Sequence, residues 1–466
     1  MTRLGLLQKH RTPLSITVLI IMGFAAMGDR VHAEQSIVDA LTSGKVDLYL
    51  RYRFEFVDDD NCVVSGCPPT NDQPLDAAYA STLRTALGYS TGLFYDFGAY
   101  VQLEDVRVVG NDTYNDGGSN GVVDKAVVVD PEGTEINQAN LRYRGIPKTT
   151  LKLGRQEIEH RQAPLHRWIG NILWRQNWQS FDAFRVTSDY VPATVLDYSY
   201  VWNTNRIFGE DNPLPDRSDF RMDSYFLRAV YSGFPLGKVE PYAYLLDFES
   251  TTSAGLSTQT YGLRFEGAYD IITYPVKILY TAEYANQSDY GDNPADINVN
   301  YFLGEAGFTY SFVDLPIELV TVKGSFEVLE GDGCSNPAPV TGSCGGRLAR
   351  ALQTPLGTNH AFQGWADRFL TTPADGIEDA FVTLNLRVYG TNFLAVWHSL
   401  MANDADYDYG TEWNLLLERP IGNHFLAGVK YAYYDASGDA LNRARNRISG
   451  QAFDLEKAWA YVQFKF

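Results

Sequence analysis

The chain ends in Ala458-Trp459-Ala460-Tyr461-Val462-Gln463-Phe464-Lys465-Phe466, and this segment sets the frame for the whole molecule. Every second residue counted back from Phe466 is apolar, whereas the intervening positions carry Lys465, Gln463, Tyr461 and Trp459. A period of two is typical of a β-strand with one face toward an apolar medium and the other toward water. Within a membrane such a strand needs a partner for its free edge, so we expect it to pair with the first strand and close a barrel. A soluble edge strand is the alternative.

The N-terminal residues have the pattern of a secretory signal peptide. Arg3, Lys9 and Arg11 form a basic start, an apolar run follows, and Val31-His32-Ala33 provides a small-residue cleavage site. The apolar run is too short to span a bilayer as a helix. We therefore expect residues 1–33 to be cleaved on export and residues 34–466 to form one barrel domain in a Gram-negative outer membrane.

The composition fits membrane-spanning strands. The chain has 30 Tyr, 25 Phe and 40 Gly, yet its mean hydropathy is only −0.23. Alternation explains this combination, because half of each strand faces lipid and half faces water. The net charge of −19 argues against nucleic acid as a partner.

The four cysteines form two local pairs within Gly-, Pro- and Asn-rich segments. Cys62 lies near Cys67, and Cys334 lies near Cys344. We expect two loop disulfides formed in the oxidising periplasm. A metal site is the alternative, but the spacing does not suit one.

Alternating segments recur along the chain and place charged side chains on the water-facing side. In residues 46–56 the polar positions alternate strictly with apolar ones, and the same pattern recurs in later segments. The predicted pore-lining basic residues are Arg51, Arg53, Arg84, Arg142, Arg144, Lys152, Arg155, Arg264 and Arg387. The predicted pore-lining acidic residues are Asp47, Glu55, Glu104, Glu266 and Glu418. Strict alternation turns Arg155 outward, so its place in the lumen requires a bulge or a position above the lipid. The alternative for the set is that arginines and acids pair to fill a wide polar interior.

The connections between these segments predict the strand number. Short turn-like breaks, such as Gly145-Ile146-Pro147, alternate with longer polar connections. About eight short turns and nine long connections imply an all-β fold, a single antiparallel transmembrane barrel of about eighteen strands with short periplasmic turns and long external loops.

Several motifs together resemble the alginate-export family of outer-membrane barrels. They are Gly154-Arg155-Gln156, Trp174-Arg175-Gln176-Asn177, residues 358–367 (Thr-Asn-His-Ala-Phe-Gln-Gly-Trp-Ala-Asp) and Gly410-Thr411-Glu412-Trp413. The resemblance covers nearly the whole mature chain. It implies an eighteen-stranded barrel whose lumen carries arginines that attract a polyuronate and acidic partners that hold those arginines in place. Arginine suits this role because its planar fork matches carboxylates.

Residues 358–367 also invite a catalytic interpretation. We expect instead that Asn359, His360, Trp365 and Asp367 pin a long loop to the barrel rim by hydrogen bonds. His160 and His166 lie near two glutamates without a recognised metal-ligand spacing. We therefore expect no enzyme activity, no metal and no cofactor.

The expected function is a passive outer-membrane channel for an anionic saccharide or similar polar solute. The alternatives are a substrate-selective uptake porin for small molecules and, less favoured, a barrel hydrolase or an adhesin. Expected partners are outer-membrane lipid, lipopolysaccharide and the barrel-assembly machinery, which would read Phe466. Acidic residues crowd the predicted external loops, where they would repel a polyanion, bind divalent cations that bridge to lipopolysaccharide, or simply be solvated.

Overall fold

The computed structural model describes residues 36–61, 75–214, 216–331, 350–446 and 449–466. The four cysteines and the predicted signal peptide lie outside these residues, so both remain predictions.

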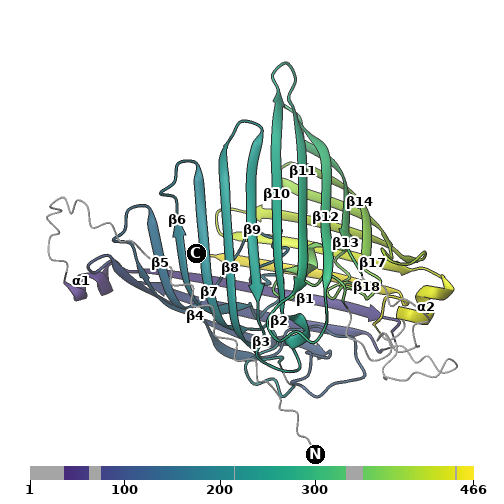
Figure 1. Cartoon of the computed structure of the whole chain (residues 1–466), viewed down its shortest axis with the longest axis horizontal. Helices are drawn as coiled ribbons and strands as arrows, with labels where there is room; N and C mark the ends of the chain where they lie inside the picture. The colour runs from purple at the N-terminus through teal and green to yellow at the C-terminus, as the bar shows by residue number, and fades with distance from the viewer. Residues whose placement is uncertain (1–35, 62–74, 215, 332–349, 447–448) are drawn as a thin grey trace, which may run out of the picture.

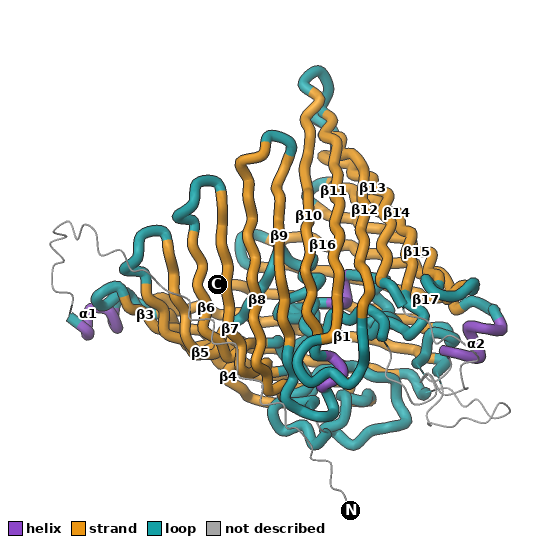
Figure 2. The backbone as a smooth tube through the Cα atoms, viewed as in Figure 1, coloured by secondary structure: helices purple, strands orange, loops and turns teal. Residues whose placement is uncertain are grey.

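The described residues form one antiparallel sheet of eighteen strands in which neighbours in sequence are neighbours in space (Figures 1 and 2). β1 also pairs with β18, and the sheet therefore closes into a barrel. This confirms the predicted fold. The strands are β1 (Lys45–Asp59), β2 (Ala78–Ser90), β3 (Phe97–Thr113), β4 (Gly133–Tyr143), β5 (Thr149–Gln156), β6 (Ser180–Ser188), β7 (Thr194–Asn205), β8 (Asp219–Phe234), β9 (Gly237–Leu246), β10 (Thr258–Ile271), β11 (Val276–Asp289), β12 (Asn298–Ser311), β13 (Ile317–Leu329), β14 (Ile377–Val388), β15 (Thr391–Met401), β16 (Asp408–Ile421), β17 (Phe425–Ala436) and β18 (Leu455–Lys465).

In the described part of the chain, one short helix precedes β1 and the others lie in connections between strands. They are α1 (Ile37–Thr42), η1 (Ala254–Leu256), η2 (Asn359–Ala361) and α2 (Ala440–Asn446). Ser36 caps α1, and its side chain and that of Asp39 bond each other's backbone amides in a capping box. No helix of the described residues has the length and apolar character that crossing a membrane requires.

The C-terminal strand has the predicted faces. Tyr49 lies opposite Lys465, and the Phe466 amide donates to the Leu48 carbonyl at 3.0 Å. On the outer parity, Val462 is 46% exposed, whereas Trp459 on the inner parity is 2% exposed. Most of the large exposed apolar side chains of the other strands lie on the outer face as well, while buried polar and charged residues fill the interior. A soluble protein has the opposite arrangement, with apolar residues inside and polar residues outside. The arrangement seen here suits a barrel surrounded by lipid.

The connections alternate between short turns and long loops along the whole barrel, as predicted. Two long loops turn inward. The β5–β6 loop (residues 157–179) and the described part of the β13–β14 loop (residues 330–331 and 350–376) contain many buried residues, among them Trp168, Arg175 and His360. The two segments pack against the inner wall and against each other, and we call them the constriction loops.

Candidate functional site

The two constriction loops meet inside the barrel through backbone contacts. The Gly170 amide donates to the Leu356 carbonyl at 3.0 Å, and the Thr358 amide donates to the His166 carbonyl at 2.8 Å. The Gln179 side chain also donates to the Leu356 carbonyl, at 3.1 Å. Together the loops occupy part of the interior of the barrel.

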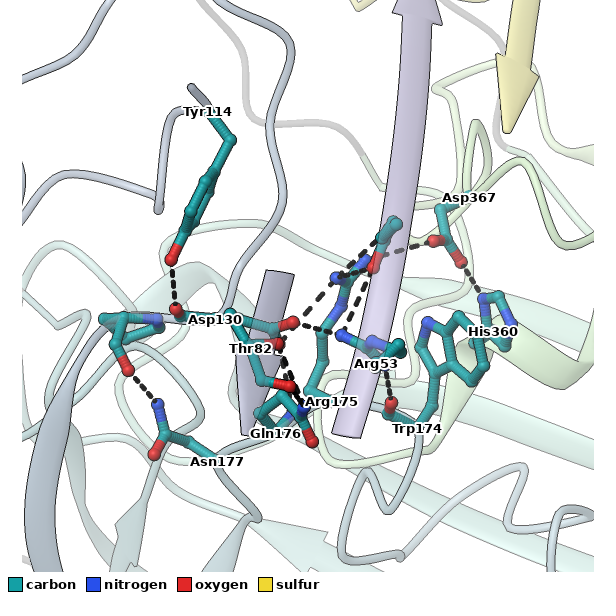
Figure 3. A network of polar contacts seen from close by, with 12 residues as sticks. Arg53, Thr82, Tyr114, Asp130, Trp174, Arg175, Gln176, Asn177, His360 and Asp367 are labelled. Atoms are coloured by element: carbon teal, nitrogen blue, oxygen red, sulfur yellow. Dashed lines mark hydrogen bonds and ion pairs between the residues drawn. The ribbon is translucent and has the colours of Figure 1, made fainter. Parts of the chain in front are cut away.

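Arginines of β1 and β2 hold the β5–β6 loop against the wall, and Figure 3 shows one of them, Arg53, bonded to Trp174. Arg51 donates to the carbonyls of Leu173, at 2.8 Å, and of Arg175. Arg53 donates to the carbonyl of Trp174, and Arg84 donates to that of Gln176. Four successive carbonyls of one loop are thus bound by three guanidinium groups, each fully or nearly fully buried. These arginines face the interior as alternation predicted, but they act as anchors for the loop.

Asp130 of the β3–β4 loop completes this anchor (Figure 3). Its carboxylate pairs with Arg53 and accepts from the Gln176 amide at 3.0 Å. Arg175 lies 3.2 Å from Glu55 of β1. Burial opposes the charge of Arg175, but Glu55, Asp130 and Asp367 outweigh burial and raise its pKa. The predicted acidic residues Glu55 and Glu104 therefore pair with arginines, and Glu104 does so with Arg84.

His360 and Asp367 join the β13–β14 loop to the same network. The His360 Nδ1 lies 2.6 Å from Asp367, and the His360 ring stacks on Trp174 with centroids 3.8 Å apart. Lys430 of β17 lies 2.5 Å from His360 Nε2, and Lys457 of β18 lies 2.9 Å from Asp367. Burial holds the pKa of His360 well below its usual value, so the ring is neutral and accepts from Lys430 while donating to Asp367.

The predicted loop motif therefore bonds to the wall, but inside the barrel. The amide of Trp365 donates to Asn414 of β16 at 3.0 Å. Asn359 instead bonds within its own loop, to the carbonyls of Thr354 and Leu370. The expectation of contacts at the rim is corrected, because the loop turns into the lumen, where buried strand side chains supply its partners.

The far wall anchors the β5–β6 loop through a second set of ion pairs. Arg161 bridges Glu240 of β9 at 2.9 Å and Glu283 of β11 at 2.7 Å. Arg264 of β10 shares Glu283 at 2.8 Å. Arg167 pairs with Glu327 of β13 at 2.7 Å. These loop arginines were missed from sequence, because outside a strand no periodicity tells where a side chain points. Of the predicted residues here, Arg264 is buried and Glu266 lies 3.1 Å from it.

A row of basic side chains follows the inner wall on the side of β4 to β8. Arg142 lies opposite Lys152 and Lys152 opposite Arg185 in the strand registers. On the next pair of strands, Arg228 of β8 lies opposite Asp197 of β7. Arg185 pairs with Asp197 at 2.9 Å and Arg228 with Glu240 at 2.8 Å. Arg142 bonds only Ser90 and the Thr91 carbonyl, and no carboxylate among the described residues forms an ion pair with Arg142 or Lys152.

Two predicted basic residues, Arg144 and Arg387, keep the inward parity but lie at the turn end of the barrel, and a third, Arg155, faces outward. Arg144 follows the end of β4 and is exposed at a periplasmic turn. Arg387 is 55% exposed and pairs with Glu318 at 2.9 Å near the turn end of the wall. Arg155 pairs with Asp182 at 2.9 Å on the outward parity, which it shares with the exposed Leu153. Its assignment to the lumen is corrected, because β5 pairs with both neighbours without the bulge that an inward turn requires.

The remaining predicted acidic residues face the interior without a basic partner among the described side chains. Asp47 accepts from Tyr100 at 3.0 Å and from Gln102 at 3.2 Å. Glu418 accepts from Tyr461 at 2.7 Å.

The histidines near Glu157 and Glu159 lie beside protein hydroxyl groups. His160 Nδ1 lies 2.9 Å from the Tyr244 hydroxyl, and burial lowers the pKa of His160 to about 3. Groups of three or more potential ligands are absent from the described residues.

The closed barrel, its apolar outer face and its charged, loop-filled lumen define a porin-type channel of the bacterial outer membrane. Residues 44–316, more than half of the chain, match the family described as alginate export, and the chain belongs to this family. No curated protein matches the chain in sequence.

Solved structures of outer-membrane proteins have the same fold. OccAB4 of Acinetobacter baumannii has a TM-score of 0.63 and 13% identity, over 92% of this chain and 99% of its own. The structure of OpdK of Pseudomonas aeruginosa with vanillate has a TM-score of 0.62 and 12% sequence identity, and the match covers 91% of this chain and 99% of OpdK. OpdQ of the same organism has a TM-score of 0.59 and 12% sequence identity, and the match covers 92% of this chain and 99% of OpdQ. At these identities the likeness shows the fold alone.

Proposed function

We propose that this channel passes carboxylated, saccharide-type solutes by passive diffusion and selects them by positive charge on its inner wall. The observation that carries the proposal is the basic row of β4 to β8. Its members Arg142 and Lys152 neighbour each other across two strands and lack a carboxylate partner among the described residues. Rings and rows of Arg or Lys are the usual device of anion-selective pores.

The anchored arginines contribute less to selection. Arg51, Arg53 and Arg84 donate to loop carbonyls or pair with buried acids, so their hydrogen-bonding groups are largely occupied. Their role is to hold the constriction loops, which set the width of the route. Selection by charge then falls to Arg142 and Lys152, whose side chains are only half-buried.

The proposed function is tested by block of ion current through single barrels in planar bilayers. Oligomers of galacturonate are expected to interrupt the current in a concentration-dependent way, whereas neutral maltose oligomers of similar length are expected to do so only at about tenfold higher concentration, because a single charged hydrogen bond is worth about that factor. Equal block by both would contradict selection by charge.

A second candidate is an uptake channel for small organic acids. It is favoured by the likeness in fold to OpdK, whose structure was solved with vanillate, the anion of an aromatic acid. Swelling of liposomes in vanillate, together with the absence of block by galacturonate oligomers, would favour this candidate.

A further inference from the structure

A cavity of about 550 Å³ lies on the external side of the constriction loops. Its lining comes from the described part of the β7–β8 loop (residues 206–214 and 216–218), the β9–β10 loop and both constriction loops. Trp174, Arg175, His360 and Asp367 form part of its lining, so the cavity borders the network drawn in Figure 3. This volume is in the range of sites for small organic ligands.

Two arginines of the β7–β8 loop reach this cavity while stacked on aromatic rings. The Arg206 guanidinium lies 4.0 Å from the ring centre of Phe220 and 4.8 Å from that of Phe208. The Arg217 guanidinium lies 4.5 Å from Phe208. The rings fix the planes of both guanidinium groups, so less conformational entropy is lost when a ligand binds.

Most of the donors of these two groups are unused by the described side chains. Arg206 donates to the Asp216 carbonyl, and neither arginine forms an ion pair with a described carboxylate. Burial and the charge of Arg217 lower the pKa of Arg206 to about 10, so Arg206 stays charged at neutral pH. Arg206 is half-buried and Arg217 is exposed, and two like charges side by side gain from an anion placed between them.

The rest of the lining narrows the class of ligand. The acidic side chains are Asp216 and Asp367, and Asp367 is already bound by His360 and Lys457. Apolar surface comes from Ile172, Ile207, Leu256 and Leu370, while Gln179, Gln353 and Asn359 carry amides. A guanidinium pair suits a carboxylate, apolar surface suits the face of a ring, and amides suit hydroxyl groups.

We propose that this cavity is a capture site for one carboxylate-bearing sugar ring, held by Arg206 and Arg217 on the external side of the constriction loops. The inference deepens the proposed function and rests on it. It assigns recognition at the external mouth to a site separate from the basic row, which lies on the wall of β4 to β8 below.

The test is binding of galacturonate to the detergent-folded barrel, measured by calorimetry. Galacturonate is expected to bind, whereas galactose, which lacks the carboxylate, and acetate, which lacks the ring, are expected to bind at least about tenfold more weakly. The variant R206Q/R217Q is expected to lose about tenfold or more in affinity. The variant R206K/R217K, which keeps the charge but not the planar fork, is expected to fall between it and the wild type.

The matched control is K125Q, because Lys125 lies in the external β3–β4 loop and pairs with Asp76 outside the cavity. Its affinity is expected to equal that of the wild type. Heat-dependent gel mobility verifies that each variant is folded. Wild-type affinity in folded R206Q/R217Q, or equal binding of galactose, would overturn the capture site. The proposed function is scored separately, because block of the wild-type current by galacturonate oligomers does not require the capture site.

Discussion

At the scale of single residues, arginine has two uses in this protein. The guanidinium groups of Arg51, Arg53 and Arg84 donate hydrogen bonds to loop carbonyls, and those of Arg53 and Arg84 also pair with buried acids. Arg142 and Lys152 keep a charge that no described carboxylate neutralises in an ion pair. Only the unpaired charges of Arg142 and Lys152 can attract an anion from a distance, because the field of a paired charge is largely cancelled by its partner.

Buried histidines make the stability of the barrel depend on pH. His160 is 2% exposed and its folded pKa is lowered to about 3 by burial, whereas an unfolded histidine has a pKa of about 6.5. Between these values the unfolded chain binds more protons, so stability is lost as the pH falls below about 6.5. The loss has a slope of up to about 1.4 kcal/mol per pH unit.

We therefore predict that H160Q flattens the decrease in unfolding temperature between pH 6.5 and pH 4.5, as followed by heat-dependent gel mobility. Glutamine retains a partner for Tyr244. The control H424Q removes an exposed histidine at the β16–β17 turn and is expected to leave the decrease unchanged. The same pH dependence in H160Q and the wild type would contradict this account.

The facing of single residues was predictable where strands alternate cleanly, as in β1. What Arg51 bonds was not predictable, because its carbonyl partner in Leu173 lies 122 residues away along the chain. Arg185 was missed for another reason: β6 has apolar residues at Phe181, Ala183 and Phe184, on both parities, so its pattern is ambiguous. Arg185 lies opposite Lys152 on the inner wall, and this placement is known only from the pairing of β5 with β6.

At the scale of elements, the β5–β6 loop is one of the two segments that fill the interior of the barrel. It is held by arginines of β1 and β2 on one side and by Glu240, Glu283 and Glu327 of the far wall on the other. The stacking of Trp174 on His360 also holds the β5–β6 loop in place. Strand periodicity gives no information about such a loop, so its path inside the barrel was not predictable.

We predict that R51Q loosens the loop without removing anion selectivity. Arg51 donates to Gln176 at 2.8 Å and to two carbonyls, and each charged hydrogen bond contributes roughly 1.5–3 kcal/mol. Single-channel recordings are expected to show noisier current, and protease is expected to cleave residues 157–179 faster. R107Q is the control, because Arg107 is exposed on the outer face beside Asp105. A quiet R51Q channel with reduced anion selectivity would show that Arg51 lines the pore instead.

At the scale of the whole molecule, net charge and local field point in opposite directions. The chain carries −19 overall, yet the basic row lies on the inner wall. Net charge governs solubility and long-range steering, whereas the field inside a narrow, low-dielectric passage is set by the nearest unpaired groups. The closed barrel was predictable as a whole, because the alternation of its first and last strands agrees with the pairing of β1 and β18.

The central claim is that unpaired cations on the wall of β4 to β8 select anions, and the reversal potential in planar bilayers under a KCl gradient tests it most directly. The wild type is expected to be anion-selective. R142Q/K152Q is expected to lose most of that selectivity, while R107Q keeps it. Cation selectivity of the wild type, or an unchanged reversal potential in folded R142Q/K152Q, would contradict the account.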